Sequence, residues 1–590
     1  MKKHELLAAL LLLTLLAPLF FYQLGTASLW HPDEPRFAAS ARAMLERHDL
    51  ITPWWNGRPR FDKPILLYWM ILISYRLLDV SVLAARIPVA ILALATLWVT
   101  YRMGRLLAGH RAGILALLIA ATSFRFVAWH RIALTDAPLC FAVALGWLAA
   151  ARWLEQPQRR APALLLALAA ALGFLAKGPV ALALLAAPPL IAIALGRRWQ
   201  ELKNFPWLGA AAVFVLIGLP WYALMLWIHG RAYFDYFFIG DNLQRYLDPS
   251  FRPRPITYFV PVLLSDSLPW TLPLLAALVL HLGRWRRLLQ KTEEPRLLLL
   301  IAVLFTFGFF SLGAYKLPHY LLPLFPPAAA LTADAILIGT RLKRRWLKLC
   351  WDLTGLALLV LAAVAALHSH LVLEAKDPPA YLPALALLIG GLALLLLRLR
   401  LRVAAPWALA CSAIVFYLAV IERILPEYER TKPVPVLAHR IHRELAARAH
   451  RKTPPNPRVI LFEQEQPALM WYIHRPIEEL RGMELLLDRL QARRLTFVIT
   501  DAEGFDRVRS LHPELDLTLL ERRTPYMPRA ENLLRPERVK DPGRDLVLFS
   551  NRPSRLGAAA RPPRARARKS RTQAEAAAAT IPPALSWSSS

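Results

Sequence analysis

The sequence predicts an all-α polytopic membrane domain of about 13 transmembrane helices, with juxtamembrane helices on its outer face and a small soluble C-terminal α/β domain. Three observations predict this fold class. Hydrophobic residues make up 56% of the 590 residues, apolar runs of near membrane-spanning length recur along the chain, and cations occupy alternate loops between these runs. A soluble domain of this size cannot bury so much apolar surface in one core.

Thirteen apolar runs define the predicted helices. Several are shorter than the ~20 residues that a helix needs to cross a bilayer, so only their approximate positions are predicted. A further apolar stretch, 65–75, is interpreted as a re-entrant or interfacial segment. The predicted spans are 6–21, 83–99, 113–126, 137–151, 163–174, 180–195, 207–228, 258–282, 297–314, 321–339, 349–367, 381–397 and 403–421.

The loops predict the orientation of the helices. By the positive-inside rule, the basic loops and the N-terminal Lys2 and Lys3 are cytoplasmic. All the basic segments fall on one side when thirteen spans are assumed, and one missed span would place them on both sides. The loops with acidic, aromatic and His residues then face outwards, at 25–64, 130–136, 177–179, 229–257, 315–320 and 368–380.

Neither the net charge nor the cysteines indicate a ligand or a catalytic site. The formal net charge of +31 is spread over inter-helix loops and the C-terminal tail, which is typical of membrane topology and anionic lipid and does not indicate nucleic acid. Cys140, Cys350 and Cys411 each lie inside an apolar run, so neither disulfides nor a thiolate metal site are expected. The first apolar run lacks a clear small-residue cleavage site and is interpreted as an uncleaved helix.

The chain is expected to divide into three parts: a transmembrane domain over 1–425, a small α/β domain over 426–555, and a disordered basic tail over 556–590. Strand-like runs at 459–462, 496–500 and 546–550 alternate with amphipathic stretches and predict the α/β unit. The orientation of the spans places this unit outside. The tail is rich in Arg, Ala, Pro and Ser.

The first two outward loops carry carboxylates at the ends of spans. Asp33 and Glu34, beside Arg36, could position a metal ion, a sugar hydroxyl or a nucleophile. The alternative is a helix cap, with Pro35 in the first turn. Asp136 lies at the mouth of the next outward span, where an ionisable residue is costly and indicates function, although capping explains it too.

The cations of the outward loops suit a phosphate at the membrane surface. Lys63 follows Asp62, and Arg245 can bind phosphate through two N–H groups. In the loop at 315–320, Lys316, His319 and Tyr320 could bind an anion through a cation, an imidazole and a phenol. Interfacial anchoring and snorkelling explain such residues equally well. The predicted substrate- and phosphate-binding set is Arg36, Lys63, Arg245, Lys316, His319 and Tyr320.

Taken in order, these motifs resemble the GT-C class of polyprenyl-phosphate-dependent glycosyltransferases, in the protein-mannosyltransferase-like superfamily. Within it they look most like the bacterial enzymes that transfer 4-amino-4-deoxy-L-arabinose to lipid A. The resemblance covers about residues 1–425, and all its elements lie on the predicted outer face. These elements are Asp33-Glu34-x-Arg36, Asp62-Lys63-Pro64, Asp136, Lys177-Gly178, Gln244-Arg245-Tyr246 and Lys316-Leu317-Pro318-x-Tyr320.

The resemblance implies roles for these residues. Asp33 matches the aspartate regarded as catalytic, and Asp136 matches the second acidic motif. Glu34, next to Asp33, is included in the predicted catalytic set. Lys63 and Arg245 match residues that hold the lipid phosphate, where they would stabilise the leaving group while an acceptor attacks the anomeric carbon from the opposite face and inverts it. Asp33 would accept a proton or orient the acceptor.

The resemblance also raises the possibility of a metal ion. In similar enzymes a metal has been associated with the first Asp, the acidic residue before Lys, and a later His. These positions hold Asp33, Asp62 and Asn242 here, and Asp62 is one methylene shorter than the Glu of the pattern. Two carboxylates and an amide suit a harder cation than zinc. A tightly bound zinc is therefore not expected, and a divalent metal ion at Asp33 and Asp62 is the predicted cofactor if there is one.

The function implied is an inner-membrane glycosyltransferase that uses an undecaprenyl-phosphate-sugar donor on the periplasmic side, most simply moving 4-amino-4-deoxy-L-arabinose to a lipid A phosphate. No Gly-rich phosphate-binding loop occurs, which fits a lipid donor rather than a nucleotide sugar. Transfer of another sugar to protein or to a different glycan stays open. The expected partners are the lipid donor, the acceptor and membrane lipid, and no nucleic acid.

Two other classes of protein have many spans as well. A transporter or flippase would show internal repeats with interrupted helices in two halves, and thirteen spans without such symmetry do not fit one. A scaffold whose C-terminal domain binds partners is the third class. Turnover of a polyprenyl-phosphate-sugar by the purified protein would exclude both.

Overall fold

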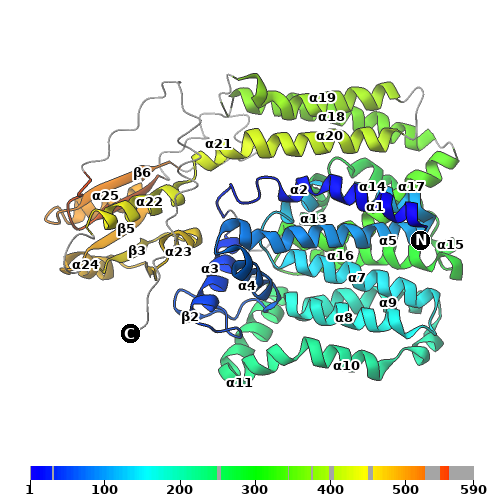
Figure 1. Cartoon of the computed structure of the whole chain (residues 1–590), viewed down its shortest axis with the longest axis horizontal. Helices are drawn as coiled ribbons and strands as arrows, with labels where there is room; N and C mark the ends of the chain where they lie inside the picture. The colour runs from blue at the N-terminus through cyan, green and yellow to red at the C-terminus, as the bar shows by residue number, and fades with distance from the viewer. Residues whose placement is uncertain are drawn as a thin grey trace. The chain divides into compact units, whose positions relative to one another are not determined.

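The structure is a computed structural model that describes residues 2–29, 32–248, 254–342, 345–371, 373, 377–397, 404–448, 456–524 and 545–556. These residues form two compact units, one ending at Arg430 and the other beginning at Thr431 (Figure 1). The first unit is helical and the second is built on a five-stranded sheet. The predicted fold class is confirmed. The tail predicted at 556–590 lies outside the described residues except for Leu556.

The first unit is a bundle of long apolar helices that lie side by side (Figure 1). In the described ranges, nine helices are long and apolar enough to cross a membrane, and eleven spans result if each of two bent pairs counts as one. The nine are α1–α2 (Lys3–Leu16, Pro18–Phe21), α5 (Val82–Thr122), α7 (Asp136–Glu155), α8 (Arg160–Lys177), η4–α16 (Lys291–Glu293, Glu294–Leu312), η5–α17 (Pro318–Leu324, Phe325–Arg341), α18 (Arg345–Leu371), η6–α19 (Pro378–Tyr381, Leu382–Leu397) and α20–η7–α21 (Ala405–Ala419, Val420–Ile424, Leu425–Arg430).

The bent pairs and short helices complete the bundle. One pair, α10 (Trp207–Gly218) and α11 (Pro220–Phe234), continues through η2 (Asp235–Gln244) and α12 (Arg245–Leu247) and bends by 48°. The other, η3–α13 (Ile256–Tyr258, Phe259–Asp266) and α14 (Thr271–Leu282), bends by 120°. The remaining helices are α6 (Phe124–Trp129), α9 (Pro179–Leu195), η1 (Trp199–Asn204) and α15 (Trp285–Leu288).

Helix α5 is two antiparallel helices joined by a tight turn. Ala108 and Gly109 leave the helical conformation, and Gly109 has a φ of +78° that favours glycine. The Tyr101 hydroxyl lies 3.0 Å from His110 Nδ1, so the chain folds back on itself across the turn. The two halves match the spans predicted at 83–99 and 113–126. The second half of α5 and the 17-residue α9 match two predicted spans, but each is shorter than the ~20 residues needed to cross a bilayer, so by length the described residues contain nine to eleven of the thirteen predicted spans.

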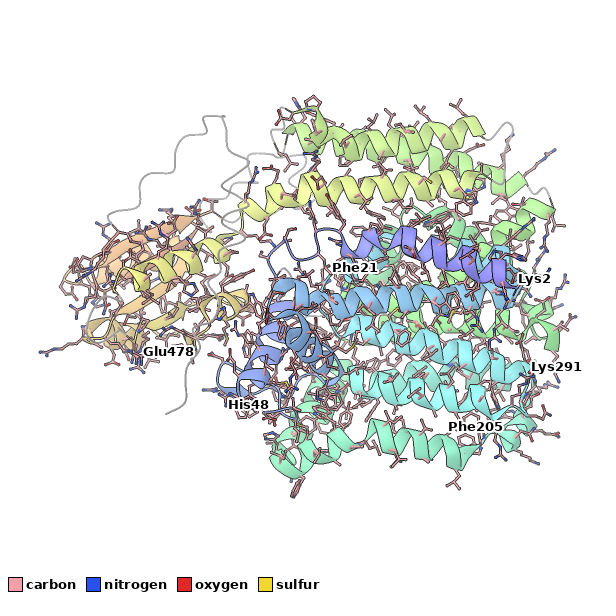
Figure 2. The ribbon with its side chains drawn as sticks, viewed as in Figure 1. Lys2, Phe21, His48, Phe205, Lys291 and Glu478 are labelled. Carbon is pink, nitrogen blue, oxygen red and sulfur yellow. The ribbon has the colours of Figure 1, made fainter. Side chains whose placement is uncertain are left out.

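The ends of the bundle carry different residues. Figure 2 places Lys2, Phe205 and Lys291 at one end of the helical unit, and Phe21 and His48 at the opposite end. The first end therefore collects segments predicted to be cytoplasmic, and the second collects segments predicted to face outwards.

Two short helices and a hairpin lie at the end predicted to face outwards. Helix α3 (Asp33–Glu46) packs on α4 (Leu66–Leu78), and the rings of Phe37 and Tyr68 are 5.3 Å apart. Between them, β1 (Trp54–Trp55) pairs antiparallel with β2 (Arg58–Pro59). The 13 residues of α4 are too few to cross a bilayer, which agrees with the interfacial segment predicted at 65–75.

The second unit is an α/β domain, in which helices cover both faces of a five-stranded sheet. Strands β3 (Arg458–Phe462), β5 (Thr496–Asp501) and β7 (Leu546–Ser550) match the three predicted strands and are almost wholly buried. The strand order is β4-β3-β5-β7-β6, with β3 parallel to β4 and β5, and β7 antiparallel to both its neighbours. The other elements are α22 (Pro433–Ala446), α23 (Pro467–Ile473), β4 (Glu478–Leu480), α24 (Met483–Gln491), α25 (Ala502–Leu511) and β6 (Thr518–Arg523).

Candidate active site

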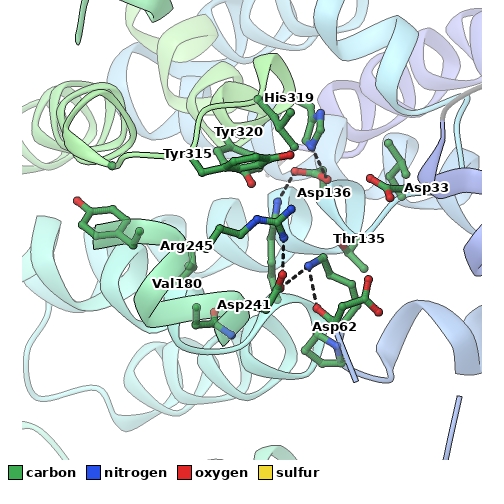
Figure 3. A pocket seen from close by; sticks show the side chains of 18 of the residues that line it. Asp33, Asp62, Thr135, Asp136, Val180, Asp241, Arg245, Tyr315, His319 and Tyr320 are labelled. Carbon is green, nitrogen blue, oxygen red and sulfur yellow. Dashed lines mark hydrogen bonds and ion pairs between the residues drawn. The ribbon is translucent and has the colours of Figure 1, made fainter. Parts of the chain in front are cut away.

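A cavity of about 270 Å³ lies where helix ends meet the loop between α3 and α4, among segments that the sequence predicted to face outwards (Figure 3). Its walls come from α3, the loop before α4, the start of α7, the end of α8, the η2–α12 segment, and the chain between α16 and η5. Segments that are far apart in the sequence thus converge on one space. Most of the predicted site residues line it: Asp33, Arg36, Asp62, Lys63, Asp136, Arg245, His319 and Tyr320.

The lengths of α7 and α8 place an ion pair at the cavity. Asp136 begins α7 and Lys177 ends α8, so the antiparallel helices bring these residues to the same end. Helix α8 stops there because Gly178 has a φ of +70° and Pro179 begins the next helix. A Cβ on Gly178 would also lie 2.7 Å from the Phe237 ring, so glycine allows this close approach.

Asp136 is the centre of a charged cluster. Lys177 Nζ donates to Asp136 Oδ1 at 2.6 Å, and His319 Nε2 lies 3.7 Å from Oδ2 (Figure 3). The Lys177 ammonium also lies 4.6 Å from the centre of the Tyr320 ring. One Asp136 oxygen therefore contacts an ammonium and the other lies near an imidazole. These contacts fix the carboxylate, which is placed to orient groups in the cavity.

Lys63 and Arg245 meet on a single carboxylate. Lys63 Nζ lies 2.5 Å from Asp241 Oδ2, and the Arg245 guanidinium donates to Asp241 Oδ1 (Figure 3). The Arg245 guanidinium lies over the Tyr315 ring, 4.2 Å from its centre. The sequence analysis expected both cations at a phosphate, and the structure brings them together around one anionic group.

The segment that carries Asp241 is a π-helix, η2. Such segments are rare and frequently lie at functional sites. Asn242, which also lines the cavity, donates from Nδ2 to the Phe237 carbonyl at 2.7 Å, so its amide is engaged in holding the wide turn. This contact uses Nδ2, whereas a metal at the position that the sequence pattern associates with Asn242 would bind the amide through Oδ1.

Asp33 is the most open of the predicted catalytic carboxylates. It begins α3, about a third of its side chain is exposed, and its Oδ1 lies 3.3 Å from Arg36 Nη1. This long contact at a partly solvated site leaves the carboxylate accessible to a substrate in the cavity.

Asp62 is held by an arginine. Arg60 donates from Nε and Nη2 to the two Asp62 oxygens at 2.6 and 2.9 Å. Arg60 is itself fixed, because its guanidinium lies 4.7 Å from the centre of the Phe37 ring and its backbone N–H bonds to the Pro53 carbonyl. Burial by itself would raise the pKa of Asp62, but Arg60 and Lys63 hold this pKa well below its usual range.

The donor set around Asp33 and Asp62 does not fit a tightly bound divalent ion. Arg60 already neutralises Asp62, and among the described residues no group of three or more His, Cys, Asp and Glu side chains is arranged to hold a metal. A metal bound by Asp62 would have to displace a bidentate guanidinium.

Two predicted site residues lie outside the cavity lining. Glu34 is fully buried. Arg86 donates hydrogen bonds to both of its carboxylate oxygens, and the Ala133 backbone N–H donates to Oε1. Lys316 is buried too, and its ammonium donates to the backbone carbonyls of Gly313 and Arg254 at 2.6 and 3.2 Å. Neither side chain faces the space that a substrate would enter, so the geometry does not support the catalytic and phosphate-binding roles predicted for them.

The structure adds residues that the predicted set omitted. Lys177, Asp241 and Tyr315 all line the cavity and contact predicted residues there. The Lys-Gly-Pro sequence after a span was a usable signal for Lys177. Asp241 lies four residues before Arg245, which is the spacing of an ion pair on a helix.

Comparisons with known proteins agree with this fold. The family described as dolichyl-phosphate-mannose-protein mannosyltransferase matches residues 62–223. The undecaprenyl phosphate-alpha-4-amino-4-deoxy-L-arabinose arabinosyl transferase of Pseudomonas aeruginosa is 31% identical over 382 residues, which are 62% of this chain and 67% of the relative. Its namesake from Aeromonas hydrophila is 30% identical over 426 residues, covering 67% and 76%.

The fold has a counterpart among solved structures. The crystal structure of ArnT from Cupriavidus metallidurans bound to undecaprenyl phosphate matches 92% of this chain and 98% of its own, with a TM-score of 0.72 and 20% identity. At this identity the match supports the architecture, and it includes the C-terminal unit within its coverage.

The fold and these relationships define a multi-pass glycosyltransferase of the GT-C type, from a bacterial inner membrane, that uses a lipid-phosphate-sugar donor. Within this class, the chain belongs to the family of undecaprenyl phosphate-alpha-4-amino-4-deoxy-L-arabinose arabinosyl transferases. The resemblance noted from the sequence motifs is therefore confirmed.

Proposed function

We propose that the protein transfers 4-amino-4-deoxy-L-arabinose from undecaprenyl phosphate to a phosphate group of lipid A, on the periplasmic side of the inner membrane. The family relationship supports the donor, since the relatives are named for undecaprenyl-phosphate-linked aminoarabinose. The positive-inside pattern supports the periplasmic side, because α3, which lines the cavity, lies at the end of the bundle opposite Lys2 and Lys291 (Figures 1 and 2).

One observation carries the proposal: a single cavity is lined by both a pair of cations and two carboxylates. Lys63 and Arg245 lie together on one wall, and Asp33 and Asp136 line the same space. A lipid phosphate bound between the two cations would present its sugar to these carboxylates. Four segments far apart in the sequence supply these groups, which favours a reaction centre over surface anchoring.

Lys63 and Arg245 would act on the leaving group. As the bond between the anomeric carbon and the phosphate oxygen breaks, negative charge grows on the phosphate. Both cations are largely enclosed, with 18% and 31% of their side chains exposed, so their interaction with that charge is stronger than at an open surface. Tyr315, stacked on Arg245, keeps the guanidinium in place.

The acceptor would attack from the face of the sugar opposite the phosphate and so invert the anomeric carbon. A lipid A phosphate is already ionised, so the attack needs no strong base. Asp33 would then stabilise positive charge that develops on the sugar, or orient the acceptor, and Asp136 would hold the sugar with Lys177 and His319. In this scheme Glu34 and Lys316 stabilise the fold through their contacts with other parts of the protein.

Mass spectrometry of lipid A tests the proposal. A strain that lacks its own transferase but makes the undecaprenyl-phosphate-aminoarabinose donor should gain lipid A carrying one added aminoarabinose when it expresses this chain. A strain expressing Lys63→Gln should lose the gain, and one expressing Asp235→Asn should keep it, because Asp235 is exposed and lies outside the cavity. Unchanged lipid A, with the wild-type protein present in the membrane, would overturn the assignment of sugar and acceptor.

A further inference from the structure

Every cation in the cavity lining already has a carboxylate partner. Arg36 contacts Asp33, Lys177 contacts Asp136, and Lys63 and Arg245 both contact Asp241. A lipid phosphate that binds the cation pair therefore competes with Asp241 for Lys63 and Arg245. The charged residues that line the cavity are Arg36, Lys63, Lys177, Arg245, Asp33, Asp62, Asp136 and Asp241.

Asp241 has the position that a phosphate would take. Its two oxygens are divided between the two cations, Oδ2 on the Lys63 ammonium at 2.5 Å and Oδ1 on the Arg245 guanidinium. Its side chain is 15% exposed and faces the cavity (Figure 3). Two acidic oxygens that bridge a lysine and an arginine reproduce the contacts expected of two non-bridging phosphate oxygens.

The charge on the lipid changes during the reaction. A donor in which phosphate joins the lipid to the sugar carries one negative charge, whereas the product lipid phosphate is a monoester with a charge of about −1.5 to −2 near neutral pH. The same two cations therefore hold the product more tightly than the donor. Unless something competes for these cations, tight product binding slows release.

We propose that Asp241 is a positioning residue that exchanges with the lipid phosphate. In the resting enzyme its carboxylate pairs with Lys63 and Arg245, it yields this place to the donor phosphate, and it returns to the cations to displace the polyprenyl phosphate product. This inference rests on the proposed function, since it takes a lipid phosphate as the ligand of the cation pair.

A static role for Asp241 makes the opposite prediction. If the carboxylate only held the two cations in position, removing its charge would disorder them and weaken binding of the lipid phosphate. If it competes with the phosphate, removing its charge strengthens that binding. The sign of the change in affinity therefore distinguishes the two roles.

The experiment measures binding of undecaprenyl phosphate to the full chain in nanodiscs. Asp241→Asn should bind the lipid phosphate about tenfold more tightly than wild type or better, a conservative expectation for removing a unit charge at this range. Asp241→Ala should change affinity in the same direction, which keeps the test usable if one variant fails to fold. Asp241→Glu, which keeps the charge, should bind within about threefold of wild type. Asp235→Asn is the matched control, the same charge change on an exposed residue of the same helix, and should leave the affinity unaltered.

Transfer kinetics give the second readout. For Asp241→Asn, steady-state kcat should fall about tenfold while the rate of a single turnover stays near that of wild type, because only product release is slowed. Equal or weaker binding of undecaprenyl phosphate by both neutral variants would overturn this inference alone. Failure of wild type to bind undecaprenyl phosphate would overturn the proposed function as well.

Discussion

Glu34 and Arg86 form a two-point ion pair inside the protein: Arg86 Nε lies 2.7 Å from Oε1, and Nη2 lies 2.8 Å from Oε2. Arg86 also donates to the backbone carbonyls of Leu24, Ala27 and Ser28. The pair therefore fastens the start of α3 and the first outward loop to the outward end of α5. Asp33, the adjacent residue, is held at the cavity by this attachment.

Replacing Glu34 should reduce stability more than chemistry. Glu34→Gln leaves the Arg86 charge buried without its carboxylate, which costs about 3–5 kcal/mol. We expect a clear fall in the thermal unfolding midpoint in detergent. A double variant, Glu34→Gln with Arg86→Met, should be less destabilised than the sum of the two single variants. A Glu34→Gln protein as stable as wild type but inactive would instead restore Glu34 to the catalytic set.

The sequence predicted the architecture well because its signals are local. Apolar runs and basic loops mark spans and sides, and short apolar runs mark β3, β5 and β7. Irregular features were less accessible. The turn at Ala108 and Gly109 falls between two predicted spans, but the π-helix η2 depends on packing between segments, and no residue pattern in the chain specifies it uniquely.

The site prediction failed for residues whose environment depends on packing between distant segments. Asp33 and Glu34 are neighbours with the same chemistry, yet one lines the cavity and the other is enclosed, because Glu34 finds a partner 52 residues away. Lys316 lies in a motif suited to binding an anion, but its ammonium donates to the backbone carbonyls of Gly313 and Arg254. Asp241 was omitted from the predicted site because its contact with Lys63 spans 178 residues.

Removing either cation of the phosphate pair should impair transfer. We expect Lys63→Gln and Arg245→Gln each to lower kcat/KM about 100-fold, because an enclosed charge-assisted contact to phosphate contributes about 1.5–3 kcal/mol. The rate is measured with a polyprenyl-phosphate-sugar donor and purified protein. Arg231→Gln is a suitable control, since Arg231 is 90% exposed and lies outside the cavity lining. Full activity in both pocket variants would place the phosphate elsewhere.

Asp33 and Asp136 should differ in their kinetic signatures. Asp33→Asn should lower kcat about 100-fold or more with little change in KM, because its open carboxylate acts on the reacting groups. Asp136→Asn should raise KM as well, because it releases Lys177 and His319 from their present positions. Retention of full kcat by Asp33→Asn would remove its proposed role.

Chelation of divalent ions should leave the enzyme active. Arg60 already neutralises Asp62 at both oxygens, and this donor set favours the guanidinium over a bound metal. Transfer rates measured before and after dialysis against EDTA should agree within about twofold. In Arg60→Gln, the freed Asp62 carboxylate should make activity or stability respond to added divalent ions. Loss of wild-type activity on chelation, restored by one metal, would contradict this prediction.

Stability should fall as the pH is lowered from 6.5 towards 4, and His130 is one cause. Its ring is fully buried against Phe20 and Phe126, and its Nδ1 lies 2.9 Å from the Phe126 carbonyl. Among the described residues Nε2 has no hydrogen-bond partner. Burial therefore lowers the pKa of His130 to about 4, because the charged ring would lose its hydration without gaining a partner.

The sign follows from the two protonation states. Between pH 6.5 and 4 the unfolded chain binds a proton at this histidine and the folded chain does not, so stability is fully present above pH 6.5 and is lost as the pH falls through the folded pKa. The difference between an ordinary histidine pKa of 6.5 and a folded pKa of about 4 corresponds to about 3 kcal/mol. Thermal unfolding midpoints across this range should show a smaller slope for His130→Gln than for wild type. Equal slopes would mean that another group carries the pH dependence, since a glutamine at this position cannot take up the proton.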